Sequence, residues 1–521
     1  MGDYLNLSNI GFEESIRSEI YVDKTGLIEY TNRVIRTQQK YICFSRPRRF
    51  GKTMAADMLT AYYSRGCQSE RIFADLSIAA APSFKEHLNQ YNVIFLNIQD
   101  FMSKYHKIDR MISKITEKVS TEVLKDHPSI DISAADDLPD IMQALFNFTK
   151  IPIIFILDEW DCIFREHKSD KGAQIVYLDF LRSLLKDKKY VALAYMTGIL
   201  PIKKYGTHSA LNMFREFSMT DPGKLAEFVG FTHNEVMTLC SGYLIDYKEM
   251  EQWYDGYRFP GLGAVYNPKS VVEAIISGRC NNYWSQTETF EALSVYIRMN
   301  FEGLKDTIVE LMAGENKRVD IRTFTNDMVT FTNYNDVLTL LIHLGYLGYD
   351  FDTKEVFIPN KEIMDEFVST VKIADWDEIS AALNASDDLL KATWRGDAEA
   401  VARYMEKAHY ETSVIQYNDE NSLSCIISLA YYSAREYYTI VREMPAGKGF
   451  ADLIFLPRKK YPDKPAMIVE LKWDKTAAGA VRQIRDRQYD EILRDYRDNA
   501  LLVGINYSKD TKLHECVIER I

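Results

Sequence analysis

The sequence lacks the patterns that would place the protein in a membrane or in an oxidising compartment. No apolar run approaches the roughly 18 residues that span a bilayer. The first residues, MGDYLNLSN, hold no basic-then-apolar signal and, with Asn6, no myristoylation pattern. The seven cysteines are scattered and form no CxxC pair. This pattern excludes a cysteine-built zinc site and fits a reducing compartment, so we expect a soluble, cytoplasmic protein without membrane contacts.

The chain also lacks an excess of positive charge, internal repeats and low-complexity tracts. Its 63 Lys and Arg residues are outnumbered by 75 Asp and Glu residues, which gives a formal net charge of −12. A generally basic nucleic-acid binder is thereby excluded, so any contact with nucleic acid must use a local patch. The chain has 521 residues, of which 46% are hydrophobic and 26% are charged. That length and composition predict about two to four globular domains.

The stretch from Tyr41 to Met54, YICFSRPRRFGKTM, has the pattern of a phosphate-binding loop. It opens with an apolar run that predicts a buried strand, and Met54 to Tyr62 has the periodicity of a helix. Backbone N–H groups at a helix start attract a polyphosphate. Lys52 would reach the β- and γ-phosphates, and the Thr53 hydroxyl would ligate Mg²⁺. Arg46 stands where the usual pattern has its first glycine, so GKT alone fits an ordinary helix start with an exposed lysine equally well.

A second motif favours a nucleotide site. Ile153 to Leu157 is an apolar run that ends in Asp158 and Glu159, as a Walker B strand does. The aspartate would hold Mg²⁺ and the glutamate would polarise the attacking water, although a buried strand before an acidic turn would look the same. Both motifs follow buried strands in the order of a P-loop NTPase, which favours ATP binding. Thr197, at the tip of the strand 191–196, is either a sensor of the γ-phosphate or an ordinary strand-end residue.

Towards the end of the chain, two predicted strands carry an acidic residue and a Glu-x-Lys pair. Asp452 lies in one strand, and Glu470 and Lys472 share one face of the next, Ala466 to Lys472. If the strands pair, two carboxylates and an ammonium group converge. Such a group suits metal-assisted phosphodiester hydrolysis, in which the lysine orients the nucleophile or stabilises the developing anion. The alternative is a surface ion pair on an edge strand, which the preceding Ile468-Val469 disfavours.

Together these motifs resemble the AAA-ATPase-like proteins that carry a C-terminal PD-(D/E)xK nuclease-type domain. In that family the arginine-rich form of the loop is usual, so Arg46 fits the pattern. The resemblance extends over nearly the whole chain, and the segments that carry it are SRPRRFGKT (45–53), YVDKT (21–25), WYDGYRF (253–259), YNP (266–268), 447–453 and 469–472.

The resemblance implies a nucleotide site with bound Mg²⁺. It places YVDKT beside the nucleotide, Glu159 in catalysis, and Thr53 and Asp158 on the metal. The expected nucleotide contacts are Arg46, Pro47, Arg48, Arg49, Phe50, Gly51, Lys52, Thr53 and Asp158.

The resemblance also implies a second metal site in the C-terminal domain. Glu420 matches a further acidic residue that supports the metal, with Glu436 as the competing candidate. Gln483 and Tyr489 match a family pattern near the site. The catalytic residues would be Asp452, Glu470 and Lys472, and the metal ligands would be Asp452, Glu470 and Glu420.

Strands that alternate with helices predict an α/β fold with a parallel sheet covered on both faces, in which ligands bind at the carboxyl ends of the strands. Residues 337–349 and 355–358 predict a helix, a turn and a hairpin, which resemble a winged-helix-like lid. WYDGYRF is either a base-stacking platform or, as we prefer, a packed aromatic turn. The expected domains are an AAA-like P-loop core (1–220), a helical lid (221–375), a helical linker (376–410) and a restriction-endonuclease-like α/β domain (411–521).

We therefore expect an ATP-hydrolysing protein with a Mg²⁺-dependent nuclease-type domain that acts on DNA, in defence or mobile-element biology. Arg482, Arg485 and Arg487 belong by default to a solvated mixed face, and the alternative is that they meet phosphates. The alternative function is an NTP-driven signalling or assembly switch whose nuclease-like domain only binds a partner. The intact Asp452, Glu470 and Lys472 favour the first function, and the acidic net charge favours the second. Assembly into a homo-oligomer and the arginine finger, for which Arg215 is one of several candidates, stay open.

Overall fold

The computed structural model describes residues 2–133, 136–202, 211–284, 291–299, 301–326, 328–373, 376–411, 420–446, 449–488, 493, 496 and 499–521. The chain forms two compact units. The first comprises Met1–Thr287 with Arg318–Ile363, and the second comprises Glu288–Lys317 with Met364–Ile521. Each unit is described by itself, and the finer four-domain division stays a prediction.

The first unit is built on a parallel sheet. Its strands are β1 (Tyr41–Ser45), β2 (Asn92–Asn97), β3 (Ile153–Asp158), β4 (Val191–Gly198) and β5 (Arg215–Phe217). The order is β2-β3-β4-β1-β5, and each of the four pairings is parallel. The strands β1, β3 and β4 are buried along their whole length, as apolar runs covered on both faces must be. The predicted α/β class is confirmed, and both motif strands end at the same edge of the sheet.

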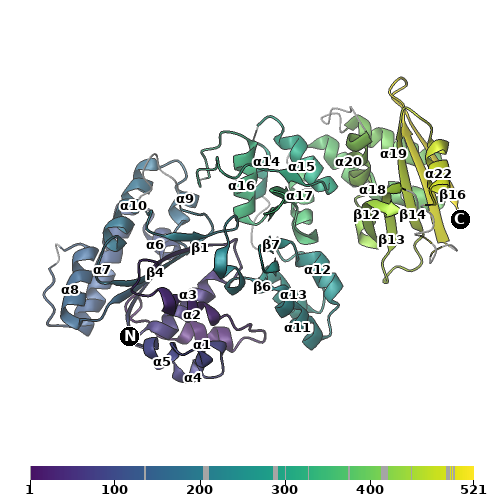
Figure 1. Ribbon diagram of the computed structural model, residues 1–521. Coiled ribbons are helices and arrows are strands. Elements are labelled where there is room, and N and C mark those ends of the chain that lie inside the picture. The colour runs from purple at the N-terminus through teal and green to yellow at the C-terminus, as the bar shows by residue number, and fades with distance from the viewer. Residues whose placement is uncertain are drawn as a thin grey trace. The chain divides into compact units, whose positions relative to one another are not determined.

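Helices cover both faces of this sheet. Figure 1 shows α3 on one side and α6, α9 and α10 on the other, and α3 packs against β2, β3 and β4. In α7 the buried residues recur every three or four positions from Ile108 to Val123, which gives the helix its apolar stripe. The helices are α1 (Ile10–Ile16), α2 (Gly26–Val34), α3 (Lys52–Tyr63), α4 (Glu70–Phe73), η1 (Ser77–Ala80), α5 (Phe84–His87), α6 (Ile98–Tyr105), α7 (Ile108–Asp126), α8 (Leu138–Thr149), α9 (Cys162–Glu166) and α10 (Lys171–Leu185).

The rest of the first unit is mainly helical and holds two small sheets. The predicted helix, turn and hairpin are present: α16 ends at Gly345 with φ of 89°, and β10 pairs antiparallel with β11. The other small sheet has the order β6-β8-β7. The elements are η2 (Gly223–Phe228), β6 (Phe231–Thr232), α11 (His233–Tyr243), α12 (Tyr247–Tyr254), β7 (Tyr257–Phe259), β8 (Gly263–Tyr266), α13 (Pro268–Ser277), β9 (Lys317–Arg318), α16 (Tyr334–Leu344), β10 (Gly348–Asp350), β11 (Glu355–Phe357) and the start of α17 (Lys361–Ile373).

The WYDGYRF segment is a packed aromatic turn and not an exposed stacking platform. All four of its aromatic side chains are buried, and the Tyr257 hydroxyl donates to the Gly345 carbonyl at 2.6 Å. Gly256 has φ of 123°, and a Cβ at this position would lie 2.2 Å from the Pro359 carbonyl oxygen. The segment therefore requires a glycine both for its backbone conformation and for the close approach of the 359 backbone.

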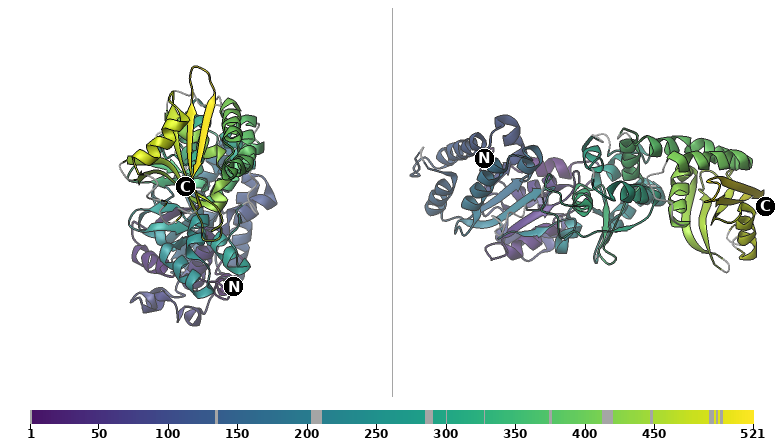
Figure 2. Two further views of the ribbon diagram at one scale, coloured as in Figure 1. Left: turned by 90° about the vertical axis from the view of Figure 1, so that its right-hand side faces the viewer. Right: turned by 90° about the horizontal axis from the view of Figure 1, so that it is seen from above.

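The second unit contains a mixed sheet between two layers of helices. Its order is β12-β13-β14-β15-β16, and only β14 and β15 run parallel. Figures 1 and 2 show α22 on one face and α18 to α20 on the other. The elements are α14 (Glu291–Ile297), α15 (Leu304–Ala313), α18 (Asp377–Arg395), α19 (Ala398–Glu411), α20 (Glu420–Ala430), α21 (Ala434–Tyr437), β12 (Tyr438–Ala446), β13 (Gly449–Pro457), β14 (Ala466–Trp473), α22 (Ala477–Asp486), β15 (Ala500–Tyr507) and β16 (His514–Arg520).

One predicted helix of the second unit is divided. The sequence predicts a helix from Ile426 to about Glu436, whereas the structure has α20, a turn and then α21. The backbone N–H of Ser433, within the turn, donates to the Ser386 hydroxyl of α18 at 2.8 Å. A tertiary hydrogen bond thus takes the place of an intrahelical one, which local periodicity cannot reveal.

Replacing Gly256 should test the close approach at the aromatic turn. Gly256→Ala should lower the free energy of unfolding of the first unit by about 2–4 kcal/mol, because it adds backbone strain and a clash with Pro359. The matched control is Gly242→Ala in α11, where a Cβ meets nothing within 4 Å. That change should be neutral or stabilising by up to about 1 kcal/mol. Urea unfolding followed by tryptophan fluorescence measures both, and equal midpoints for the two variants would contradict the analysis.

Candidate functional site

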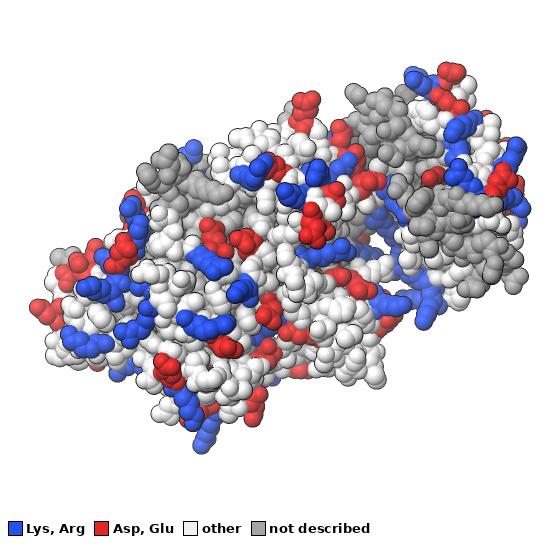
Figure 3. All heavy atoms as spheres, viewed as in Figure 1, with Lys and Arg blue, Asp and Glu red and all other residues white. Residues whose placement is uncertain are grey.

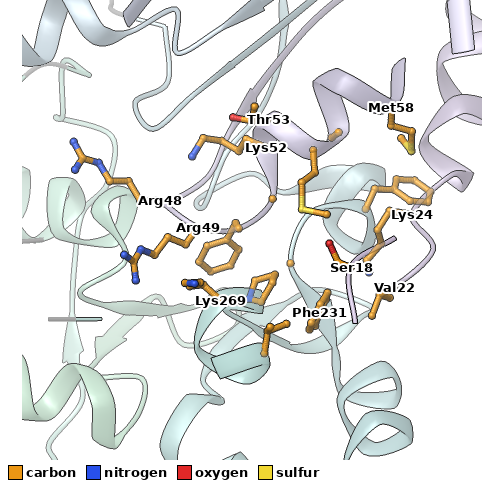
Figure 4. A pocket seen from close by; sticks show the side chains of 18 of the residues that line it. Ser18, Val22, Lys24, Arg48, Arg49, Lys52, Thr53, Met58, Phe231 and Lys269 are labelled. Atoms are coloured by element: carbon orange, nitrogen blue, oxygen red, sulfur yellow. The ribbon is translucent and has the colours of Figure 1, made fainter. Parts of the chain in front are cut away.

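A pocket of about 790 Å³ lies at the carboxyl edge of the parallel sheet. Its walls come from the predicted phosphate-binding loop, the start of α3, the YVDKT segment, the ends of β2 and β3, the residues from the end of η2 to the start of β6, and α13. Figure 4 shows Arg48, Arg49, Lys52 and Lys269 at one end, and Val22, Met58 and Phe231, together with Ser18 and Lys24, at the other. One end is therefore suited to an anion and the other to an apolar, planar group.

The loop before α3 has the backbone that its sequence predicts. Gly51 caps the helix in the left-handed region with φ of 90°, a conformation that favours glycine. Lys52 is buried, and its Nζ donates to the Pro47 carbonyl at 2.9 Å. Burial lowers the pKa of Lys52, although the carboxylates of Glu159, Asp161 and Asp158 oppose the shift. The ammonium group thus lies within its own loop, at the basic end of the pocket.

The buried carboxylate of Asp158 gathers the polar ends of three neighbouring elements. The Thr53 hydroxyl of α3 donates to its Oδ2 at 2.8 Å, and the Asn97 amide of β2 donates to the same oxygen at 3.3 Å. The Thr197 hydroxyl, near the end of β4, donates to Oδ1. A hydroxyl and a carboxylate thus meet beside the loop lysine, a donor set that fits Mg²⁺.

Glu159 lies on the turn directly after β3 and lines the pocket. Its backbone is left-handed, with φ of 54°. Its Oε2 forms an ion pair with the guanidinium of Arg165 in α9, and Arg165 in turn contacts Asp161 at 3.4 Å. Burial raises the pKa of Glu159, while Lys52 and Arg165 act against that shift.

The remaining residues of the arginine-rich loop separate into two groups. Arg48, Arg49 and Phe50 line the pocket, whereas Arg46 and Pro47 are not part of its wall. The Arg46 guanidinium lies inside the first unit, over the rings of Phe44 at 4.5 Å and Phe259 at 4.8 Å. It donates to the carbonyl of Ser45, and burial lowers its pKa to about 9. The position of Arg46 does not support its predicted nucleotide contact, because its charge stays in the core.

The YVDKT segment lies beside the pocket, as the resemblance implies. Tyr21, Val22 and Lys24 line it. Lys24 Nζ reaches both carboxylate oxygens of Glu235 in α11, at 2.6 and 2.7 Å. Asp23 points away and accepts hydrogen bonds from Thr25 and from the N–H of Ser77. The segment is therefore held by contacts on both sides, and it presents Tyr21, Val22 and the ion-paired Lys24 to the pocket.

Sequence reasoning missed Asn97 and Arg165. Asn97 is the last residue of β2 and lies opposite Asp158 in the register, so strand pairing would have found it. Arg165 falls in a short helix with no motif, and only its contact with Glu159 marks it. Arg215 begins β5, with its guanidinium over Phe217 at 5.2 Å, and does not line the pocket.

In the second unit the predicted carboxylates lie on adjacent strands. Leu453 of β13 pairs with Val469 of β14, so Asp452 and Glu470 are brought together. Asp452 Oδ2 accepts from the Leu471 N–H at 2.7 Å. Glu470 is buried, and its Oε1 accepts from Lys472 Nζ at 3.1 Å and from the Gln483 amide of α22.

One carboxylate oxygen of Glu470 is left without a hydrogen bond among the described residues. This oxygen, Oε2, is buried. Burial and the charge of Asp452 raise the pKa of Glu470 to about 7, against the opposing effect of Lys472. An orphaned oxygen beside a second carboxylate fits a divalent cation, because the cation would satisfy both.

The other predicted residues of this site are placed less fully. Glu420 begins α20, but its side chain and the whole of Tyr489 lie outside the described residues. Glu436 is exposed in α21, just before β12. The first residue of β12, Tyr438, pairs with Pro457 at the end of β13 that is remote from Asp452, so Glu436 lies away from the site. No group of three or more His, Cys, Asp or Glu residues that would hold a metal occurs in the described part of the chain. Arg482 and Arg485 of α22 and Arg487, which follows the helix, are exposed, and Arg485 pairs with Glu519 at 2.6 Å.

Two protein families match separate parts of the chain. Residues 11–207 match the model of the predicted AAA-ATPases, and residues 418–516 match the PD-(D/E)XK nuclease superfamily. The chain thus joins an AAA-ATPase-like domain to a PD-(D/E)XK superfamily domain. Among curated proteins, it is 23% identical over 277 residues to an uncharacterized protein in the vnfD 5′ region of Azotobacter chroococcum mcd 1. That match covers 52% of this chain and 51% of the relative, so the chain spans about half of the relative's length.

Solved structures with a similar chain path include two proteins of Aeropyrum pernix. The ORC2 protein with ADPNP and ADP has a TM-score of 0.32 and 14% identity, over 68% of this chain and 97% of that one. The ORC1 protein in complex with DNA has a TM-score of 0.26 and 14% identity, over 72% and 99%. At these scores the likeness supports no statement about function. No described helix has the length and apolar character that a membrane crossing requires.

Neutralising Glu470 should change how the stability of the second unit depends on pH. The folded-state pKa of about 7 lies above the ordinary value of 4.5. Its contribution to stability is therefore complete below about pH 4.5 and is lost as the pH rises through about 7. Glu470→Gln removes that loss, so we expect the variant to be more stable than wild type by about 1–3 kcal/mol at pH 8 and little different at pH 5. Urea unfolding at both values measures this, with the exposed Glu436→Gln as control. Equal losses of stability in wild type and Glu470→Gln between pH 5 and pH 8 would show that Glu470 does not titrate as expected.

Proposed function

We propose that the first unit binds and hydrolyses ATP. The observation that carries this proposal is the meeting of Thr53, Asp158 and Thr197 beside Lys52, at the edge of the sheet where a pocket of about 790 Å³ opens. The apolar end of the pocket would take the base, and the basic end would take the phosphates.

In this proposal each residue at the basic end of the pocket has a separate role. Lys52 leaves the Pro47 carbonyl and reaches the β- and γ-phosphates, while Thr53 and Asp158 hold the metal. Bound Mg²⁺ would neutralise charge on the phosphates. Glu159, on the wall of the pocket, accepts a proton from the attacking water. Thr197 donates to the other oxygen of the Asp158 carboxylate and so keeps Oδ2 oriented towards Thr53.

Two substitutions separate binding from turnover. Lys52→Ala should weaken ATP binding and reduce hydrolysis by about 10²-fold or more, because it removes a fixed cation. Glu159→Gln should keep ATP binding and lose about 10²–10⁴-fold in turnover, because the phosphates are still held when proton transfer fails. Fluorescent-nucleotide binding and phosphate release measure the two effects. Lys189→Ala, an exposed lysine, is the control, and unchanged hydrolysis in both site variants would exclude the assignment.

We also infer that the second unit is a metal-dependent phosphodiesterase, with DNA as the preferred substrate. The superfamily match and the convergence of Asp452, Glu470 and Lys472 support this. Asp452 and Glu470 would hold Mg²⁺, which would activate water for attack on phosphorus. Lys472, held between Glu470 and the Leu471 carbonyl, would stabilise the developing anion. A setting in defence or mobile-element biology is proposed from the family resemblance alone.

Contacts with DNA would have to be local. On the face in Figure 3, acidic and basic side chains are interspersed over the described surface, as the net charge of −12 leads one to expect. The exposed Arg482 lies on α22 next to Gln483, whose amide contacts Glu470, and the exposed Arg487 directly follows this helix. They would position a phosphate backbone at the carboxylates without carrying sequence information.

Metal binding and cleavage should respond differently to two changes in the second unit. Asp452→Asn should weaken stabilisation by Mg²⁺ or Mn²⁺ and eliminate cleavage, because one carboxylate ligand is lost. Lys472→Ala should keep the metal-dependent rise in Tm but slow cleavage by about 10²-fold, because the lysine acts on the transition state. Thermal shift and digestion of plasmid and single-stranded DNA measure the effects, with Glu436→Gln as control. ATP hydrolysis should not change in either variant.

The second candidate function is an ATP-driven switch whose C-terminal domain binds a partner without cleavage. The acidic net charge favours it. Assembly into a homo-oligomer belongs to this candidate. If wild type shows neither a metal response nor cleavage of any nucleic acid tested, the switch replaces the nuclease.

A further inference from the structure

We propose that Arg165 is a positioning residue. It holds the carboxylate of Glu159 where that group can accept a proton from the attacking water, an inference that rests on the proposed hydrolysis of ATP. Arg165 lies six residues after Glu159 and forms an ion pair with its Oε2. Both side chains line the pocket, and that of Arg165 is only 10% exposed. Glu159 is 22% exposed, so the pair is largely removed from bulk solvent, and such contacts hold their geometry better than those at the surface.

Arg165 is itself fixed by an anchored acid. Its Nε lies 3.4 Å from Oδ2 of Asp161, a residue with no exposed side-chain surface. The same Asp161 oxygen accepts from the backbone N–H groups of Ile199, at 3.0 Å, and Leu200, at 2.8 Å. These two residues directly follow β4. The chain of contacts thus runs from the end of β4 through Asp161 and Arg165 to Glu159.

The contact leaves Glu159 with one engaged and one available oxygen. Oε2 is taken by Arg165, while Oε1 forms no hydrogen bond within the described residues. A glutamate side chain has three rotatable bonds and would otherwise sample many positions on the pocket wall. Engaging one oxygen restricts the other to a narrow region, as outer contacts do for catalytic carboxylates and metal ligands in general.

Two other roles for Arg165 predict different results. As a direct ligand of the nucleotide phosphates, it would contribute to the affinity for ATP, and its loss would raise KM. As a purely structural clamp between α9 and the end of β4, it would affect Tm and not the ratio of kcat to KM. A positioning residue affects kcat and acts only while Glu159 is present.

The experiment compares Arg165→Gln and Arg165→Lys in the full-length chain, with Arg182→Gln on the exposed side of α10 as matched control. We expect Arg165→Gln to lower kcat by about 10–100-fold, with KM and Tm close to wild type. Arg165→Lys should recover part of kcat because it keeps the cation. Arg182→Gln should match wild type. A rise in KM with unchanged kcat, or no change in kcat, would overturn the proposal.

A double-mutant cycle decides whether the effect passes through Glu159. Single-turnover phosphate release is measured for Glu159→Gln with and without Arg165→Gln. We expect no further loss in the double variant, since the carboxylate to be held is already gone, whereas additive losses would show that Arg165 acts elsewhere. If Glu159→Gln hydrolyses ATP like wild type, the proposed hydrolysis fails together with this inference. If Glu159→Gln is impaired but Arg165→Gln is not, the inference alone fails.

Discussion

The carboxylate of Asp158 is the point on which the organisation of the first unit depends. It is fully buried at the end of β3, and a charge in that position is tolerated only when polar groups surround it. Thr53, Thr197 and Asn97 supply those groups from α3, β4 and β2. The same requirement that stabilises the carboxylate therefore fixes the relative positions of the helix and strands that form the pocket.

In the second unit, two carboxylates on neighbouring strands are stabilised by different contacts. Asp452 is stabilised by the Leu471 N–H, and Glu470 shares one oxygen between Lys472 and Gln483. Lys472 compensates part of the negative charge, but burial still favours the protonated form of Glu470. A site with this balance responds to any cation that enters it, since the cation replaces a proton.

The sequence predicts the framework of both sites better than the contacts around them. A buried strand followed by GKT, one followed by Asp158-Glu159 and one that carries Glu-x-Lys are all local patterns. The strands and Gly51, Lys52 and Asp158 could therefore be placed from periodicity and motif alone. Arg46 could not, because its guanidinium donates to the carbonyl of Phe217 and lies over the ring of Phe259, and both come from distant segments. Arg165 lies outside any motif for the same reason: its significance comes from Glu159 and Asp161, which only the turn after β3 brings within reach.

The strand order has a consequence for how the pocket forms during folding. Because β4 lies between β1 and β3, Thr53, Asp158 and Thr197 are joined by contacts that span 105 and 39 residues of the chain. Each contact closes a long loop, and long-range parallel pairing is slow to form. No fragment that ends before β4 contains the complete set of groups around Asp158. A nascent chain would therefore complete the groups around Asp158 only after β4 has inserted between its neighbours, and a nucleotide bound as proposed would then act as a late stabiliser of the finished sheet.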